Sequence, residues 1–430
     1  MINKVLFVTT RLFWPADSGR KVVLYNYCKG LHHQLGYDVH VYSFLEGDQT
    51  PADAAQFPEF IEDVRLASSL DGCSRAKNLL KTFVDGSASF QSALFWSEKN
   101  AMAIRSYCKE IEASIVIIDM IRLAPYIKSF DGLNIPVVLD YDDLLSKRYE
   151  RQVGMTNGNV LGKFGTQVSP LLGSFVSNRL IRNLVLSIES KRVKRAEDKY
   201  ARLADAVLFV SPIEAEELND RLKINKCFSA TIGADLIDVA SDNLNKYDFG
   251  FVGNMYTAAN QASLEYICTE ILPLLPGKTL RVIGVCPKEI LNRYSSLGRV
   301  SFSGRVETIS DELIKCKVML APFVYGTGIK TKILEAMGIG VPVVTNDVGF
   351  EGMTCKPGVE FELGNTPDTF AKCCASLLGD QQKRREMVRA AKDYIRRNHN
   401  WENSINNLGK CLDFAELEKD NHGKIGGGSR

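Results

Sequence analysis

Two glycines, two lysines and one glutamate occur together in the stretch GTGIKTKILE, residues 326–335. A glycine turn that leads into a helix presents free backbone N–H groups, and the helix dipole makes that end positive. Such a turn binds anions, of which diphosphate is the commonest. Gly326 and Gly328 allow backbone and ligand to approach closely, while Lys330 and Lys332 add positive charge. Helical spacing puts the two lysines on different faces of the predicted helix.

Glu335 lies a little more than one turn into the same predicted helix. A carboxylate beside a diphosphate would be repelled, so Glu335 suits the hydroxyl groups of a ribose on the far side. The stretch therefore predicts a site for a nucleoside diphosphate. One glycine-rich turn is a weak signal, and a plain helix–strand corner with surface lysines is the alternative.

A second group of polar residues ends an apolar stretch nearer the middle of the chain. Asp140, Asp142 and Asp143 fall in the sequence DYDD. Asp142 and Asp143 could orient or deprotonate a substrate hydroxyl. They could equally cap the helix that is predicted to follow. Asp119 ends another apolar stretch, where a role in a turn is favoured.

Short apolar stretches alternate with helical ones along the chain, which is typical of parallel sheets buried on both faces. A first series of predicted strands comprises 4–10, 38–44, 114–119, 135–143, 206–211 and 227–233. A second series comprises 248–254, 279–285, 300–306, 317–323 and 341–346. Charged helices are expected at 381–397 and 402–415.

This alternation predicts an α/β protein with two doubly wound Rossmann-like domains that face a cleft. The predicted boundaries are 1–240 for the N-terminal domain, 241–247 for a polar linker and 248–398 for the C-terminal domain, with a flexible tail at 421–430. Ligands of such sheets bind at the carboxyl ends of the strands. A dehydrogenase is disfavoured, because no G-x-G-x-x-G follows the first strand.

Composition narrows the possible partners. The 430 residues are 45% hydrophobic and 24% charged, with a formal net charge of +2. Without a basic field, nucleic acid is not an expected partner. The 11 cysteines include no C-x-x-C pair, so we expect a reducing, cytoplasmic protein, and the histidine and cysteine spacings indicate no metal site. No apolar stretch has the length of a membrane-spanning helix.

The stretch GTGIKTKILEAMGIGVPVVT resembles the donor-site signature of retaining glycosyltransferases of the GT-B fold. That family includes sucrose synthase and many bacterial polysaccharide glycosyltransferases. Three further stretches resemble the family in the expected order: FGFVGNMYTAANQASLEYICTEILPLL its donor-domain start, RVSFSGRVE its base-binding segment and WENSINNL its closing helix. The resemblance covers nearly the whole donor half and is looser over 1–240. It implies a helix at 399–420 that returns to the N-terminal domain. The variant GIKTK resembles a subgroup of family 4-like sugar transferases from bacterial exopolysaccharide (PEP-CTERM-associated) gene sets.

The resemblance assigns roles to individual residues. Glu335 matches the glutamate that binds the nucleotide ribose, and Arg305 and Val306 match the segment whose backbone reads the base. The residues that match the loops and turns around the diphosphate are Ser18, Gly19, Gly253, Asn254, Gly326, Thr327, Gly328, Ile329, Lys330, Thr331 and Lys332. The predicted catalytic residues are Lys330, Asp140, Asp142 and Asp143.

Two positions depart from the family pattern. The family usually has a further glutamate eight residues before Glu335, in contact with the transferred sugar, and this chain has Thr327 there. The family often has a histidine where this chain offers the aspartates of DYDD.

The resemblance implies transfer of a sugar, with retention, from a UDP- or GDP-sugar to a glycan or lipid-linked acceptor. Lysines and helix amides would stabilise the departing diphosphate, so we expect neither a metal nor a cofactor. Two alternatives stay open. One is a nucleotide-sugar 2-epimerase on the same fold. The other is a non-catalytic protein that binds sugar nucleotides, which the replacement of the usual glutamate by Thr327 suggests.

The stretch 171–202 combines a helical apolar stripe with eight basic and three acidic residues between Arg179 and Arg202. It could lie on the anionic cytoplasmic face of the inner membrane, where lipid-linked acceptors reside. A core-facing helix with a solvated basic face is the favoured alternative.

Overall fold

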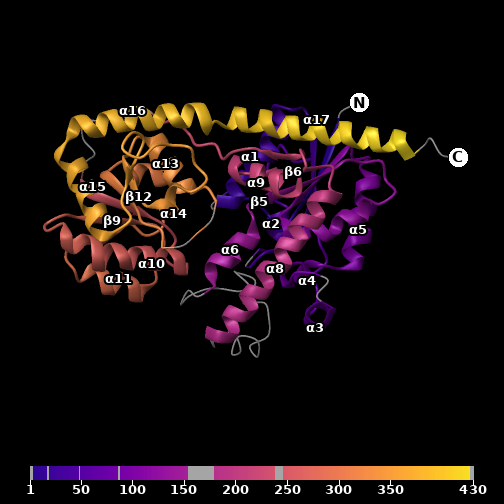
Figure 1. Cartoon of the computed structure of the whole chain (residues 1–430), viewed down its shortest axis with the longest axis horizontal. Helices are drawn as coiled ribbons and strands as arrows, with labels where there is room; N and C mark the ends of the chain where they lie inside the picture. The colour runs from indigo at the N-terminus through magenta and orange to yellow at the C-terminus, as the bar shows by residue number, and fades with distance from the viewer. Residues whose placement is uncertain are drawn as a thin grey trace. The chain divides into compact units, whose positions relative to one another are not determined.

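The computed structural model describes residues 3–16, 19–47, 49–85, 88–153, 179–237, 246–324, 326 and 328–426 (Figure 1). The chain divides into two compact units. The N-terminal unit comprises Met1–Ala230 and Glu402–Arg430, and the C-terminal unit comprises Thr231–Trp401. Each unit contains one sheet whose strands connect through helices. The predicted fold class, α/β with two Rossmann-like units, is therefore confirmed.

The N-terminal unit contains a seven-stranded sheet with the order β3-β2-β1-β4-β5-β6-β7. Its strands are β1 (Lys4–Thr9), β2 (Asp38–Ser43), β3 (Asp63–Leu66), β4 (Ile115–Asp119), β5 (Val137–Asp142), β6 (Ala206–Phe209) and β7 (Cys227–Ser229). Neighbouring strands pair in parallel. Every residue of β4 is buried, as expected of a central parallel strand that is covered by helices on both faces.

The strands of this unit are connected mainly by helices. These elements are α1 (Gly19–His33), α2 (Pro51–Ala54), α3 (Gly72–Asp85), α4 (Phe90–Phe95), α5 (Glu98–Glu110), the 3-10 segment η1 (Ile121–Phe130), α6 (Leu145–Gln152), α8 (Arg179–Leu203) and α9 (Pro212–Leu222).

The last helix, α17 (Trp401–Gly426), packs onto the N-terminal unit. Ile405, Leu408 and Cys411 on this helix are buried. Gly30 of α1 lies so close that a Cβ atom there would be 2.4 Å from Cγ1 of Ile405. The two ends of the chain therefore build one core.

The C-terminal unit contains a six-stranded parallel sheet with the order β10-β9-β8-β11-β12-β13. Its strands are β8 (Tyr247–Val252), β9 (Leu280–Ile283), β10 (Val300–Phe302), β11 (Cys316–Ala321), β12 (Val343–Thr345) and β13 (Glu362–Leu363). Its helical elements are α10 (Ala258–Tyr266), η3 (Ile267–Ile271), η4 (Leu272–Leu274), α11 (Lys288–Ser295), α12 (Ile309–Leu313), α13 (Thr331–Ile339), α14 (Asp347–Phe350), α15 (Pro367–Gly379) and α16 (Gln381–Asn398).

In both sheets the strand order reverses beside the first strand. β1 lies between β2 and β4, and β8 lies between β9 and β11. The chain runs from β1 to β2 in one direction along the sheet and from β4 to β5 in the other, and the same holds for β8 to β9 and β11 to β12. The carboxyl ends of β1 and β4, and of β8 and β11, are therefore switch points, where α/β proteins bind ligands.

Every predicted strand is present. The structure differs from the prediction in two additional strands, in the end of one strand and in the tail, and each difference has a local cause. The sequence does not predict β3 or β13, because β3 is half-buried at the sheet edge with an alternating DVRL sequence and β13 has 2 residues. The strand predicted at 227–233 ends at Ser229. The tail predicted from residue 421 is helical up to Gly426, because it continues α17, which is built from good helix formers such as Glu416 and Leu417.

Helix α8 supplies two buried carboxylates to the N-termini of other helices. Glu189 accepts hydrogen bonds from the backbone N–H groups of Phe90 and Gln91 at 2.9 and 3.0 Å, at the start of α4. Glu197 accepts from N and Oγ of Ser146 at 2.9 and 2.6 Å, at the start of α6. Burial raises the pKa of each carboxyl to about 7, although these hydrogen bonds oppose the shift.

The buried Glu197 generates a prediction about stability and pH. A carboxyl whose pKa is raised on folding stabilises the protein while it is protonated, and that stabilisation is lost as the pH rises toward 7. Between pH 5.5 and 8 the wild-type protein should lose about 2 kcal/mol more unfolding free energy than Glu197→Gln. Urea unfolding at the two pH values measures this difference.

The matched control is Glu216→Gln, at an exposed position on α9. This variant should keep the pH dependence of the wild type. If Glu197→Gln and wild type lose the same free energy over this range, Glu197 is ionised in the folded protein throughout.

Candidate functional site

The diphosphate-binding residues predicted in the C-terminal unit lie at the switch point of its sheet. β8 ends at Val252 and continues into Gly253 and Asn254, and the loop after β11 leads into α13. Gly328 in this loop has φ 68°, a conformation that favours glycine. Gly326, Gly328, Ile329, Lys330, Thr331 and Lys332 all belong to that loop or to the first turn of α13. The predicted Thr327 lies outside the described residues.

Lys332 connects α13 to the end of β8. Its Nζ atom donates to the carbonyl of Val252 at 3.0 Å and to Oδ1 of Asn260 at 2.9 Å. The same ammonium group lies 4.8 Å from the ring centroid of Phe323 and 5.3 Å from that of Phe251. Burial lowers the pKa of Lys332 to about 8, while Glu335 partly opposes that shift. A half-buried cation therefore occupies the edge between β8 and β11.

Lys330 lies beside Lys332 instead of on another helix face. It is the N-cap of α13, so helical geometry does not apply to its side chain. Its Nζ donates to the carbonyl of Gly328 at 2.5 Å and lies 5.6 Å from the ring centroid of Phe323. Only 9% of Lys330 is exposed. The expectation that the two lysines diverge is wrong, and both ammonium groups share the ring of Phe323.

Glu335 is half-buried, one turn after Lys332 on α13. Burial raises the pKa of its carboxyl, and the charge of Asp235 adds to that effect whereas Lys332 opposes it. The three charged side chains Lys330, Lys332 and Glu335 thus come from one loop and one helix.

The turn after β8 is closely packed against the end of β9. A Cβ atom on Gly284, which has φ 128°, would lie 2.2 Å from the carbonyl oxygen of Gly253. Asn254 accepts from Nδ2 of Asn260 at 2.9 Å through its carbonyl. Because Asn260 also accepts from Lys332, the turn and the half-buried cation belong to one hydrogen-bonded group.

The predicted base-reading residues follow β10. Gly304 forms an antiparallel bridge with Gly284, which brings the chain after β10 to the end of β9. Arg305 is exposed and Val306 is half-buried. The C-terminal unit therefore assembles the predicted base, diphosphate and ribose residues along the carboxyl ends of β8, β9, β10 and β11.

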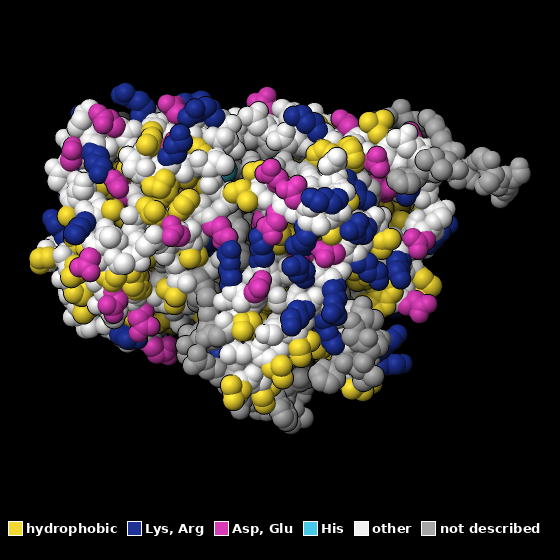
Figure 2. Space-filling view, viewed as in Figure 1, with side chains coloured by type: hydrophobic (Ala, Val, Ile, Leu, Met, Phe, Trp, Pro, Cys, Tyr) yellow, Lys and Arg dark blue, Asp and Glu magenta, His cyan; other side chains and the backbone are white. Residues whose placement is uncertain are grey.

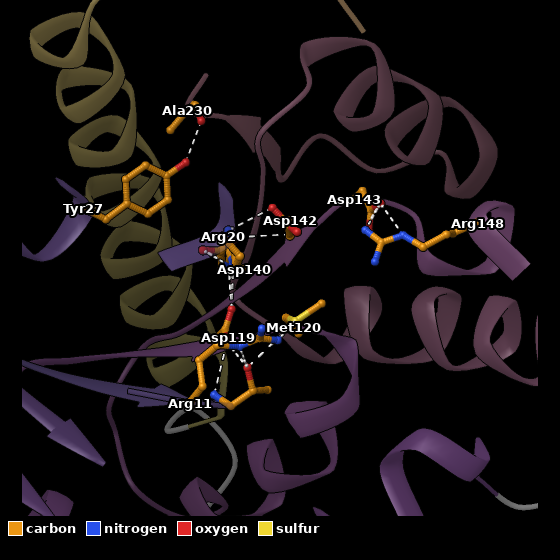
Figure 3. A network of polar contacts seen from close by, with 11 residues as sticks. Arg11, Arg20, Tyr27, Asp119, Met120, Asp140, Asp142, Asp143, Arg148 and Ala230 are labelled. Atoms are coloured by element: carbon orange, nitrogen blue, oxygen red, sulfur yellow. Dashed lines mark hydrogen bonds and ion pairs between the residues drawn. The ribbon is translucent and has the colours of Figure 1, made fainter. Parts of the chain in front are cut away.

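The N-terminal unit contains a separate polar cluster at its own switch point (Figure 3). Arg20, the second residue of α1, lies among three aspartates. Its Nη2 is 2.6 Å from Oδ1 of Asp119 and 2.7 Å from Oδ2 of Asp140, and its Nη1 is 3.1 Å from Oδ1 of Asp142. Thr10 adds hydrogen bonds from its N and Oγ1 to Oδ2 of Asp119, at 3.1 and 2.7 Å. The cluster joins the ends of β1, β4 and β5 to the start of α1.

Burial and charge oppose each other in this cluster. Burial would raise the pKa of Asp119, but the charges of Arg20 and Arg11 and the hydrogen bonds from Thr10 and Arg20 lower it overall. Burial raises the pKa of Asp140 to about 6 against the effect of Arg20. Burial also raises the pKa of Asp142. One guanidinium thus faces three carboxylates, so negative charge is in excess in this cluster.

Asp143 belongs to a different group. Its Oδ2 accepts from Nε of Arg148 at 3.1 Å (Figure 3). Leu144, the N-cap of α6, makes no side-chain cap hydrogen bond, and its own N–H donates to Oε1 of Glu214 at 3.1 Å. The alternative that Asp142 and Asp143 cap this helix is wrong, because the free N–H of Ser146 in its first turn donates to Glu197 of α8. The predicted aspartates thus divide into a pair bound to Arg20 and one bound to Arg148.

Sequence reasoning missed Arg20 and gave Asp119 a different role. The hydrogen bonds of Asp119 go to Thr10 and Arg20, whereas a turn role was favoured. The available signal is that carboxylates at the ends of two buried strands need a cation, and an arginine directly follows Gly19. Gly19 is the first residue of α1, and Ser18 lies outside the described residues.

The chain is similar to glycosyltransferases, over one segment of its sequence and in its fold. Residues 246–380 match the family described as "Glycosyl transferases group 1". Sucrose-phosphate synthase from Thermosynechococcus elongatus is similar, with a TM-score of 0.67, 14% identity and coverage of 95% of this chain and 98% of that one. Anabaena HepE in complex with UDP has a TM-score of 0.63, 13% identity and coverage of 95% and 99%. The chain has the GT-B fold.

A curated relative matches more locally. The "Glycosyltransferase 1 domain-containing protein 1" of Xenopus tropicalis is 28% identical over 133 residues, which are 30% of this chain and 39% of that protein. Within the GT-B fold, the predicted donor residues from Gly253 to Glu335 fall inside the matched segment 246–380. Gly19 and the Arg20 cluster lie outside it. The family match thus covers the segment that carries the predicted donor residues, and the solved structures show the fold.

Proposed function

We propose that this protein is a retaining glycosyltransferase that moves a sugar from a nucleoside-diphosphate sugar to a glycan or lipid-linked acceptor in polysaccharide or glycoconjugate biosynthesis. The observation that carries the proposal is the position of Lys330 and Lys332, two largely buried cations at the switch point of the unit that matches the glycosyltransferase family. The HepE structures that contain UDP and UDP-glucose favour a UDP-sugar, with a GDP-sugar as the other candidate.

In the proposed reaction the bond between the anomeric carbon and the diphosphate oxygen breaks, and a bond forms between that carbon and an acceptor oxygen. Negative charge grows on the departing diphosphate, so fixed cations beside it lower the barrier. The ammonium group of Lys332 has three donors, and Val252 and Asn260 accept two of them. The remaining donor, the ammonium of Lys330 and the backbone of the glycine turn would stabilise the diphosphate without a metal.

Glu335 is the proposed partner of the ribose hydroxyls, and the chain around Arg305 and Val306 that of the base. The aspartates of the N-terminal unit are the proposed acceptor-side residues, where a carboxylate orients or deprotonates the acceptor hydroxyl. Thr327 occupies the position where the family usually has the sugar-contacting glutamate. The proposal therefore does not name the transferred sugar, which the assay below identifies.

The donor and the reaction are tested together. A thermal-shift panel of UDP-, GDP-, CDP- and dTDP-sugars should identify the donor, because a ligand at a hundredfold excess over its Kd stabilises the folded state by about 2.7 kcal/mol. The donor is then incubated with the protein alone and with glycan or lipid-linked acceptors. A glycosylated product with the donor's anomeric configuration supports the proposal.

Two results would contradict it. A new sugar nucleotide formed without an acceptor would identify an epimerase. Donor binding without turnover on any acceptor would identify a non-catalytic binding protein.

The lowered pKa of Lys332 predicts how nucleotide affinity depends on pH. A nucleoside diphosphate binds the charged ammonium, so affinity is highest below the pKa of about 8 and falls above it. Between pH 7 and 9 the Kd for the nucleoside diphosphate should rise about tenfold. Calorimetry measures it. Lys332→Met should bind more weakly with a flat pH profile, whereas Lys330→Met should bind more weakly and keep the slope. If the Kd of Lys332→Met also rises tenfold between pH 7 and 9, Lys332 does not bind the diphosphate.

We further propose that α8 brings the enzyme to the anionic cytoplasmic face of the inner membrane, where it would meet lipid-linked acceptors. Leu180 and Leu184 at its start are 79% and 60% exposed, and Lys191, Lys194 and Arg195 are exposed further along. Figure 2 shows Lys and Arg side chains gathered over this part of the N-terminal unit. Within the described residues no helix has the length and apolar character needed to cross a bilayer, so the proposed contact is peripheral.

The membrane contact is tested by sedimentation with liposomes. The wild type should co-sediment with phosphatidylserine-containing liposomes at low salt, because each basic residue near the surface contributes about 1 kcal/mol and salt screens it. Lys191→Glu, Lys194→Glu and Arg195→Glu together should release it. Arg192 is left intact, because its guanidinium stacks 4.7 Å from the ring centroid of Phe90. A wild type that stays in the supernatant at low salt would show that the basic face is only solvated.

A further inference from the structure

The three carboxylates around Arg20 differ in their access to solvent. The side chains of Asp119 and Asp140 are 0% exposed, while that of Asp142 is 20% exposed. Arg20 itself is 8% exposed. A substrate that reaches this cluster therefore contacts Asp142, and the other two carboxylates lie behind Arg20.

The contacts of Arg20 are divided in the same way. Its Nε and Nη2 bind the two buried aspartates, with both nitrogens on Oδ1 of Asp119 and Nη2 also on Oδ2 of Asp140. Its Nη1 donates to Oδ1 of Asp142 at 3.1 Å. A guanidinium is planar and rigid, so fixing one edge fixes the other. Among the described contacts of Asp142, Oδ1 accepts from Arg20, and Oδ2 is the oxygen left for a substrate hydroxyl.

The backbone of Asp142 is also specialised. It has φ 65°, which is uncommon for a residue with a side chain, and the N–H of Asp143 donates to the carbonyl of Tyr141 across it at 2.8 Å. The pairing of β5 with β6 shifts register between Asp140 and Asp142, and such irregularities redirect side chains at the ends of strands. A strained conformation of this kind persists where the surrounding structure determines it, and it is frequent at functional sites.

We infer that Arg20 is a positioning residue that transmits the fixed geometry of Asp119 and Asp140 to Asp142, and that Asp142 accepts the hydrogen bond of the acceptor hydroxyl. This inference rests on the proposed glycosyl transfer and deepens its acceptor side. Asp142 acts as its carboxylate. Arg20 keeps that carboxylate charged and aimed, while the buried pair keeps Arg20 in place.

Asp142 has charged or titratable neighbours on every element packed against it, and these set the pH at which it ionises. They are Arg20 and Tyr27 on α1, Asp119 on β4, Asp140 on β5, Asp143 directly after β5, Arg148 on α6 and Glu214 on α9. Changing Arg20 and changing Asp140 should therefore move the ionisation of Asp142 in opposite directions.

The test measures the pH profile of kcat/KM for the acceptor in four variants. Asp142→Asn should lower kcat/KM at least about a hundredfold, the usual effect of losing such a group. Arg20→Lys keeps the positive charge but loses the planar set of guanidinium donors. It should therefore lower kcat/KM and move the acid limb, the low-pH side of the profile, upward by about one pH unit. Asp140→Asn removes a carboxylate that competes for Arg20, so the acid limb should move downward by a similar amount. Asp205→Asn, at the opposite end of β5 where Asp205 accepts from the N–H of Val137, is the matched control and should leave the limb in place.

Nucleoside diphosphate affinity and thermal unfolding report whether each variant folds. Should Arg20→Lys fail to fold, the downward shift in Asp140→Asn still decides the question. A wild type that transfers sugar while Arg20→Lys and Asp140→Asn keep its acid limb overturns this role of Arg20 alone. A wild type that transfers no sugar overturns the proposed function, and the acceptor role falls with it.

Discussion

A charge that is buried beside the end of a parallel sheet needs partners, and in both units of this protein a cation at a switch point binds oxygens at the end of a strand. In the C-terminal unit Lys332 extends from α13 to the carbonyl of Val252 at the end of β8. In the N-terminal unit Arg20 extends from α1 to Asp119 at the end of β4. The partners differ in kind. Lys332 binds neutral oxygens and remains attractive to an anion, whereas Arg20 binds carboxylates and leaves negative charge in excess.

This difference suits two different ligands. A cation with neutral partners at the edge of β8 and β11 favours a diphosphate, and the glycine turns allow the ligand to approach the backbone. A cluster with more carboxylates than cations favours the hydroxyl groups of a sugar, which donate hydrogen bonds. The charge balance of each edge therefore agrees with the proposed donor side in the C-terminal unit and the proposed acceptor side in the N-terminal unit.

The sequence predicts those parts of the protein that depend on local pattern. Continuous apolar stretches identify the central strands, and the glycine turn identifies the loop before α13, because both signals lie in neighbouring residues. The partners of the charged residues depend on contacts between distant parts of the chain. Arg20 meets Asp119 across 99 positions and Lys332 meets Asn260 across 72, so no local pattern connects them. The helix-face argument failed for Lys330 because an N-cap residue is not helical.

The packing of α17 against α1 has a consequence for how the protein forms during synthesis. The C-terminal unit is one continuous segment, Thr231–Trp401, so its whole chain is available before the ribosome finishes. The N-terminal unit is begun first, yet it lacks Ile405, the residue that fills the space above Gly30, until the last part of the chain emerges. The surface of α1 at Gly30 therefore lacks this cover while residues 231–401 are translated. The contact of Ile405 with Gly30 therefore forms only after the whole segment 231–401 has been translated.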